Sequence, residues 1–155
     1  FLEISIKTVI QDTLGLCQEK FKIHGIEILV DEFTDIHVEG RATQISQVLL
    51  NLLNNSYDAI QHLPEKWIRL VVKKLNDSTV TIELIDSGKG IPPQVAEKLM
   101  QPFFTTKEVG KGTGLGLSIS LGILQSHGGS LQYDSRSINT KFIVKLPVSQ
   151  AIKYS

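Results

Sequence analysis

The longest uninterrupted pattern in the chain runs from Arg41 to Leu63, a stretch without glycine or proline that Pro64 closes. Its apolar side chains recur at the three- and four-residue spacing of an α-helix. One side of that helix collects the apolar positions Ile45, Leu49, Leu53 and Ile60. A continuous apolar side must be buried, so the pattern predicts a long helix packed on the core of a folded domain.

The other side of this helix is rich in amides. It collects Gln47, Asn51, Asn54, Asn55 and Asp58. Asparagine is a poor helix former, and exposed helix faces are usually built from Lys, Glu and Arg, so a functional reason is the better explanation. The amide oxygens of Asn51 and Asn55, one turn apart, can coordinate a hard cation such as Mg²⁺ that also carries phosphate oxygens. The alternative is a hydrogen-bonded junction between helices, and this motif alone does not decide between the two.

The rest of the chain alternates helical and extended patterns. Helical spacing predicts helices over Leu2–Phe21, Gln94–Met100 and Leu115–His127. β-rich runs predict strands over residues 26–30, Trp67–Leu75, Thr79–Asp86, Ser130–Ser135 and Thr140–Leu146. Elements in this order predict an α/β fold, a two-layer sandwich with helices on one face of a mixed, mostly antiparallel sheet.

The composition fits a single domain over residues 1–155, with 41% hydrophobic and 21% charged residues. Sixteen basic and sixteen acidic side chains cancel, so no general attraction to nucleic acid or to an anionic membrane is expected. The single cysteine, Cys17, fits a reducing cytosolic setting. No apolar run approaches the roughly 20 residues that cross a bilayer. We therefore expect a cytoplasmic piece, without membrane contact of its own, of a parent protein that could be membrane-anchored.

A second motif, residues 86–92, directly follows a predicted strand and reads Asp-Ser-Gly-Lys-Gly-Ile-Pro. Its glycines, Gly88 and Gly90, allow positive φ and let a flat ligand approach the backbone closely. The carboxylate of Asp86 can accept a hydrogen bond from an exocyclic amine such as N6 of adenine. The alternative is an ordinary Asp-Gly turn.

Two further motifs begin in the polar stretch Pro102–Gly116, which predicts a mobile lid. In the first, Phe103-Phe104-Thr105-Thr106-Lys107, the adjacent aromatic rings are expected to dock when the lid closes, and Lys107 to reach phosphates; for Lys111 we favour solvent exposure. In the second, Gly110–Ile119, glycines at every second position free backbone N–H groups in front of a helix, which predicts a phosphate site. Neither a Walker A loop nor a dinucleotide fingerprint is present.

Taken in order, the four motifs resemble the N, G1, F and G2 boxes of histidine-kinase catalytic domains. The matching residues are Gln47–Asn55, Asp86-x-Gly88-x-Gly90, Phe103-Phe104 and Gly112-Thr113-Gly114-Leu115-Gly116-Leu117. The resemblance extends from about residue 3 to about residue 147. It implies the Bergerat ATP-binding fold shared with gyrase B, MutL and the ninety-kilodalton heat-shock chaperones.

The resemblance also implies roles for individual residues. Asn55 would be the principal Mg²⁺ ligand with Asn51 one turn earlier, and Asp86 would bind the adenine amino group. Asn51, Asn55 and Lys107 would form the catalytic set. The ATP contacts would be Asn51, Asn55, Asp58, Asp86, Gly88, Gly90, Ile91, Phe104, Thr105, Thr106, Lys107, Gly110, Gly112, Thr113, Gly114, Leu115, Gly116 and Leu117.

Two departures from the family pattern weaken parts of this assignment. Many such kinases carry a basic residue and then an aromatic one where this chain has Asp58 and Ala59, which puts phosphate contact and base stacking from the helix in doubt. Hydrolytic members place a glutamate at the position of Asn51 as the base that activates water, so water attack should be slow here.

The accepting histidine is not expected within this chain. His24, His37, His62 and His127 lack the helical setting and acidic neighbour of a phosphoacceptor, and we expect them to be structural or solvated. The implied partners are therefore an upstream dimerisation and phosphoacceptor domain and, beyond it, the receiver domain of a response regulator. The alternatives are a hydrolytic ATPase of the same fold, a non-catalytic nucleotide-binding module and an anti-sigma-type serine kinase.

Overall fold

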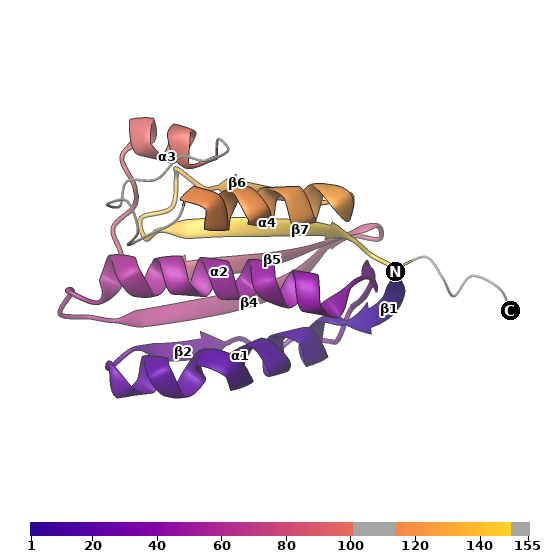
Figure 1. The fold of residues 1–155 in the computed structure, drawn as a ribbon, viewed down its shortest axis with the longest axis horizontal. Coiled ribbons are helices and arrows are strands. Elements are labelled where there is room, and N and C mark those ends of the chain that lie inside the picture. The colour runs from indigo at the N-terminus through magenta and orange to yellow at the C-terminus, as the bar shows by residue number, and fades with distance from the viewer. Residues whose placement is uncertain (101–113, 150–155) are drawn as a thin grey trace, which may run out of the picture.

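The structure is a computed structural model that describes residues 1–100 and 114–149. In chain order its elements are β1 (Leu2–Ser5), α1 (Ile6–Ile23), β2 (Glu27–Val30), β3 (His37–Gly40), α2 (Ala42–Ile60), β4 (Trp67–Asn76), β5 (Thr79–Asp86), α3 (Pro93–Leu99), α4 (Gly114–Ser126), β6 (Ser130–Tyr133) and β7 (Lys141–Pro147). Five strands form one sheet in the order β2-β4-β5-β7-β6, and β1 pairs with β3. Helices α1, α2 and α4 lie side by side over one face of the larger sheet (Figure 1).

The larger sheet is mixed and mostly antiparallel. Strand β2 pairs in parallel with β4, whereas the pairs β4–β5, β5–β7 and β6–β7 are antiparallel. Alternate side chains point into the helical layer and are buried, among them Ile68, Leu70, Val80, Ile82, Leu84, Val144 and Leu146. On the opposite face Glu83 forms ion pairs with Lys73 and Lys141, each at 3.5 Å. The predicted two-layer sandwich is confirmed.

The long helix is present as α2, and its predicted apolar side is buried. At most 1% of each residue is exposed at Ile45, Leu49, Leu53 and Ile60. Helix α1 packs beside it, with Thr13 Oγ1 and Ser46 Oγ 2.7 Å apart and the rings of Phe21 and Tyr57 in contact at 5.2 Å. The two contacts follow in the same order along both helices, so α1 and α2 run parallel.

The first helix is shorter than predicted. Residues Leu2–Ser5 form β1 and not the first turn of a helix, because they pair antiparallel with β3 from Gly40 to His37. Ser5 is extended, and its Oγ accepts a hydrogen bond from Thr8 N at 3.1 Å, which makes Ser5 the N-cap of α1. A partner strand from a distant part of the chain therefore overrides the local helical spacing.

The last helix starts one residue earlier than predicted. Because α4 begins at Gly114, both Gly114 and Gly116 lie in its first turn and not in the predicted lid. The rest of that lid, residues 102–113, lies outside the described residues. Within the described ranges, none of the helices combines the length and the apolar character needed to cross a bilayer.

His127 joins the end of α4 to the start of α2. The residue is buried, its Nε2 accepts a hydrogen bond from Arg41 N at 3.1 Å, and its Nδ1 donates to Ile123 O at 2.8 Å. This pattern describes a neutral imidazole that carries its proton on Nδ1. The ring of Phe1 stacks on it with a centroid distance of 4.5 Å. Of the two alternatives expected for His127, structural or solvated, the structure shows the structural one.

Two glycines offer a matched test of this packing. A Cβ on Gly129 would lie 2.2 Å from the carbonyl oxygen of Lys145, whereas a Cβ on Gly122, within α4, would meet nothing within 4 Å. Gly129→Ala should therefore lower the free energy of unfolding by about 1–3 kcal/mol. Gly122→Ala should raise it by about 0.5–1 kcal/mol because alanine is the better helix former. Urea unfolding measures both, and a Gly129→Ala variant as stable as the wild type would contradict the close approach.

Candidate functional site

The elements that carry the predicted motifs meet at one end of the sheet. Asp86 ends β5, and the hydroxyl of Ser56 on α2 donates a hydrogen bond to its carboxylate. On the other side of α2, Asn51 Nδ2 donates to Ser120 Oγ of α4 at 3.2 Å. The second half of α2, the end of β5 and the first half of α4 are therefore in direct contact, and α3 lies at the same end of the fold (Figure 1).

The carboxyl of Asp86 is the most deeply buried ionisable group of this region, with 2% of the residue exposed. Burial raises the pKa of Asp86, although hydrogen bonds from Ser56, the Gly88 N–H and Thr140 act in the opposite direction. The Gly88 N–H reaches Asp86 Oδ1 at 2.8 Å, so the Asp-Gly turn left open as an alternative is formed. A buried carboxyl with a raised pKa beside a glycine loop is also typical of a functional site.

Both glycines of the second motif are required by the geometry. A Cβ on Gly88 would lie 2.8 Å from Asp86 Oδ1 and 2.9 Å from Thr140 Oγ1, so no larger residue fits. Gly90 has a φ of +97°, a conformation that other residues rarely adopt. The loop of residues 87–92 between β5 and α3, here called the β5–α3 loop, thus presents bare backbone next to a buried carboxyl.

The amide-rich side of α2 is only partly exposed. Asn51, Asn54 and Asn55 are half-buried, whereas Asp58 is exposed. The bond from Asn51 to Ser120 is the helix junction that the sequence left open. In the described part of the chain, no group of three or more His, Cys, Asp or Glu side chains could hold a metal ion. Asn51 and Asn55 supply amide oxygens, which are donors of the kind that Mg²⁺ accepts.

The predicted residues of the third motif and of the first part of the fourth lie outside the described residues. They are Phe103, Phe104, Thr105, Thr106, Lys107, Gly110, Lys111, Gly112 and Thr113. Gly114 to Leu117 form the first turn of α4, where backbone N–H groups lack partners within the helix, and the Leu117 side chain is part of the core.

Sequence reasoning missed four residues that hold this site together: Ser56, Tyr133, Asn139 and Thr140. Thr140 Oγ1 accepts a hydrogen bond from Gly90 N at 3.0 Å, and Asn139 Nδ2 donates to Gly88 O at 3.2 Å. Apart from Ser56, they belong to the β6–β7 hairpin, about 50 residues beyond the loop. Single polar residues beside a strand have no local pattern, so no sequence signal identified them.

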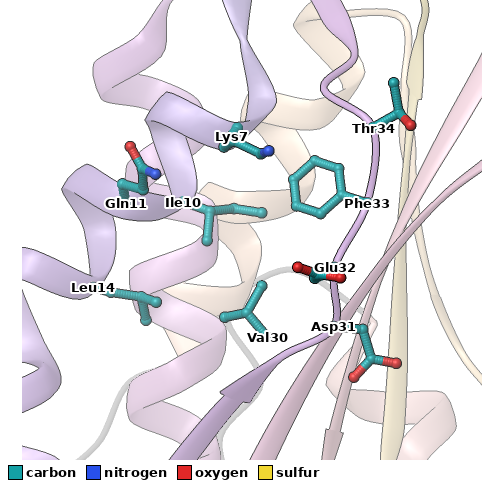
Figure 2. Close-up of a pocket in the computed structure, with 9 residues that line it drawn as sticks. All are labelled: Lys7, Ile10, Gln11, Leu14, Val30, Asp31, Glu32, Phe33 and Thr34. Atoms are coloured by element: carbon teal, nitrogen blue, oxygen red, sulfur yellow. The ribbon is translucent and has the colours of Figure 1, made fainter.

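One cavity among the described residues lies away from this site. It has a volume of about 600 Å³ and lies between α1 and the chain that follows β2. Figure 2 shows Lys7 reaching toward the ring of Phe33, whose centroid lies 5.5 Å from the Lys7 ammonium group. None of the residues that line it is a predicted site residue.

Comparisons with known proteins agree with the motifs. A family model described as histidine kinase-, DNA gyrase B-, and HSP90-like ATPase matches residues 40–150. The two-component sensor PprA of Pseudomonas aeruginosa is 38% identical over 144 residues, which cover 90% of this chain but only 16% of PprA. The chain therefore spans about a sixth of the length of that relative.

Two solved structures share the fold. The catalytic domain of histidine kinase ThkA, in a nucleotide-free form, is 34% identical with a TM-score of 0.80, and the match covers 95% of each chain. ThkA in complex with the response regulator protein TrrA is 29% identical with a TM-score of 0.79, and the match covers 96% of this chain and 42% of that one.

The raised pKa of Asp86 predicts how stability depends on pH. The pKa of Asp86 in the folded protein lies above the value of about 3.9 for an unfolded chain, so the folded state binds this proton more tightly. The contribution of Asp86 to stability is therefore greatest below about pH 4 and falls as the pH rises through the folded-state pKa. Asp86→Asn removes this titration. The free energy of unfolding of the wild type minus that of the variant should decrease as the pH rises above about pH 4 in urea titrations.

Asp35→Asn is a control of opposite sign. Partial burial opposes ionisation of Asp35, but hydrogen bonds from Ser5 Oγ, Lys7 N and Ile36 N outweigh it and lower the pKa of this carboxyl. The stabilising effect of Asp35 is present above about pH 4 and is lost as the pH falls through the lowered pKa. The free energy of unfolding of the wild type minus that of Asp35→Asn should therefore increase with pH in the acid range. A difference that also increased with pH for Asp86→Asn would mean that the fold favours the charged form of Asp86.

Proposed function

The chain belongs to the histidine kinase-, DNA gyrase B- and HSP90-like ATPase family, and from this premise we propose that it is the ATP-binding catalytic domain of a two-component sensor histidine kinase. In this proposal the domain transfers the γ-phosphate of Mg²⁺-ATP to a histidine on a separate domain. The observation that carries it is the buried Asp86 carboxyl, hydrogen-bonded to α2 and to the β5–α3 loop, at the end of the sheet where Asn51 and Asn55 also lie.

Asp86 is proposed to distinguish adenine from guanine. Adenine donates from N6 to the carboxylate, whereas guanine presents a carbonyl oxygen there and would leave a buried acceptor facing an acceptor. The bare backbone of Gly88 and Gly90, followed by Ile91, would line the pocket for the ring. This assignment requires the Asp86 carboxylate to accept from the ligand in addition to Ser56, the Gly88 N–H and Thr140, which would use the roughly four acceptor sites of a carboxylate.

Asn55 and Asn51 are proposed to hold Mg²⁺, with Asn55 as the principal ligand. When bound, the metal would neutralise charge on the triphosphate. The contact of Asn51 with Ser120 supports the proposal because it restricts the orientation of an amide that faces α4. The N-terminus of α4, with Gly114 and Gly116 in its first turn, suits the phosphates, and Lys107 is proposed to approach them.

The nucleophile is proposed to be an imidazole from another segment, because no described histidine suits the role. His24, His62 and His127 each follow the end of a helix, and His37 lies in β3, so none of the four has the helical setting of a phosphoacceptor. The partners would be a dimerisation domain that carries the phosphoacceptor and a receiver domain. The solved complex of ThkA with the response regulator protein TrrA supports a receiver as the eventual phosphate acceptor. We also propose that this domain lies in the cytoplasm.

The metal assignment predicts different behaviour of two neighbouring asparagines. Asn55→Ala should weaken ATP binding about tenfold or more in Mg²⁺ but little in EDTA, because only the metal contact is lost. Asn54→Ala, an equally half-buried amide one position away, is the matched control and should leave both affinities near the wild-type value. Calorimetry with and without Mg²⁺ measures this. Equal losses under both conditions for Asn55→Ala would refute the ligand assignment.

The proposed reaction predicts phosphate transfer in trans only. With γ-labelled ATP and Mg²⁺ the chain alone should retain no label, whereas addition of a dimerisation domain with a phosphoacceptor histidine should yield acid-labile, base-stable phosphoprotein. Rapid release of inorganic phosphate by the chain alone would instead favour the hydrolytic ATPase. Acid-stable label on an added protein would favour the serine kinase.

A further inference from the structure

The β5–α3 loop is attached to the β6–β7 hairpin by a set of hydrogen bonds. Gly88 O accepts from Thr140 N at 3.0 Å and from Asn139 Nδ2 at 3.2 Å, and Gly90 N donates to Thr140 Oγ1 at 3.0 Å. At the far end of the loop, Ile91 N donates to the phenol oxygen of Tyr133 at 2.7 Å. The last of these bonds depends entirely on one side chain.

The phenol of Tyr133 is held in a fixed place. Tyr133 is the last residue of β6 and pairs in register with Phe142 of β7. The two rings pack at a centroid distance of 5.4 Å and an angle of 56°. A side chain fixed by its strand and by a neighbouring ring presents its hydroxyl at a defined point above the hairpin.

Gly90 passes directly over that hydroxyl. A Cβ on Gly90 would lie 3.3 Å from the phenol oxygen, and its φ of +97° turns the chain so that the next N–H points at the phenol. The conformation of the loop therefore places the Ile91 N–H within hydrogen-bonding distance of the phenol oxygen. Without the hydroxyl, the Ile91 N–H would lose its acceptor at a point where the loop has no secondary structure.

Both ends of the loop are thus hydrogen-bonded to the same β6–β7 hairpin. Asp86 N donates to Thr140 O at 2.9 Å, which fixes the Asp86 end, and Tyr133 fixes the Ile91 end. A flat ligand that contacts the Asp86 carboxyl and packs on Ile91 must fit the separation that these two anchors define.

We propose that Tyr133 is a positioning residue for base recognition: its hydroxyl holds Ile91 at the distance from Asp86 that a purine occupies. The proposal rests on the proposed function, in which Asp86 and Ile91 line the adenine pocket. In this proposal Tyr133 contacts neither the base nor the phosphates. It acts through the backbone of Ile91.

Tyr133→Phe tests this, because it removes the hydroxyl and keeps the ring that packs on Phe142. We expect the dissociation constants of adenosine and of ATP to rise by the same factor, about two- to tenfold, as for the loss of one hydrogen bond. The Mg²⁺ dependence of ATP binding should not change, and the melting temperature should move by no more than about 2 °C. In NMR, the Ile91 amide should exchange with solvent faster in the variant.

Tyr57→Phe is the matched control, since it removes a phenol hydroxyl from the α1–α2 interface and should change none of these quantities. An unchanged affinity for adenosine despite faster exchange at Ile91 would overturn the proposal. So would a loss of affinity accompanied by a proportionate loss of thermal stability, which would identify a purely structural role. If the wild type bound neither adenosine nor ATP, the proposed function itself would fail, whereas a variant that binds like the wild type would refute only the role of Tyr133.

Discussion

The rest of the site depends on the burial of one carboxyl group. Removing an ionised carboxylate from water is costly unless hydrogen bonds compensate for it. For Asp86 these bonds come from three separate parts of the fold: Ser56 on α2, Gly88 in the β5–α3 loop and Thr140 before β7. The helix, the loop and the hairpin must therefore be placed correctly relative to one another before the carboxyl is satisfied. The same placement brings the amide-rich side of α2 to this end of the sheet.

Much of the fold could be predicted because its longest elements carry their own periodicity. The apolar side of α2 and the β4–β5 hairpin are local patterns, and both were located to within a few residues. In the site, Asp86, Gly88 and Gly90 were identifiable for a related reason. A glycine stands out in sequence where backbone conformation or close approach demands it, and the approach of Gly88 to Asp86 and Thr140 is such a case.

The remainder depends on contacts between distant residues. Leu2–Ser5 has helical spacing but becomes a strand because β3 supplies hydrogen-bond partners. Thr140 and Tyr133 are single hydroxyls whose importance appears only when the hairpin folds back on the loop. Asn51 stayed ambiguous for a chemical reason. An amide offers a donor at one end and an acceptor at the other, so a helix junction through its nitrogen does not exclude a ligand role for its oxygen.

The two attachments between α2 and α4 restrict how this region can move. Asn51 of α2 bonds to Ser120 of α4, and Arg41, which precedes α2, bonds to His127, which follows α4. The two antiparallel helices are therefore joined by two hydrogen bonds at different points along their length. Sliding α4 along α2 would have to break both bonds at once. Movement of α4 that keeps both bonds is therefore confined to its first turn, ahead of Ser120. The part of α4 from Ser120 onward, as far as His127 with the ring of Phe1 stacked on it, stays in register with α2.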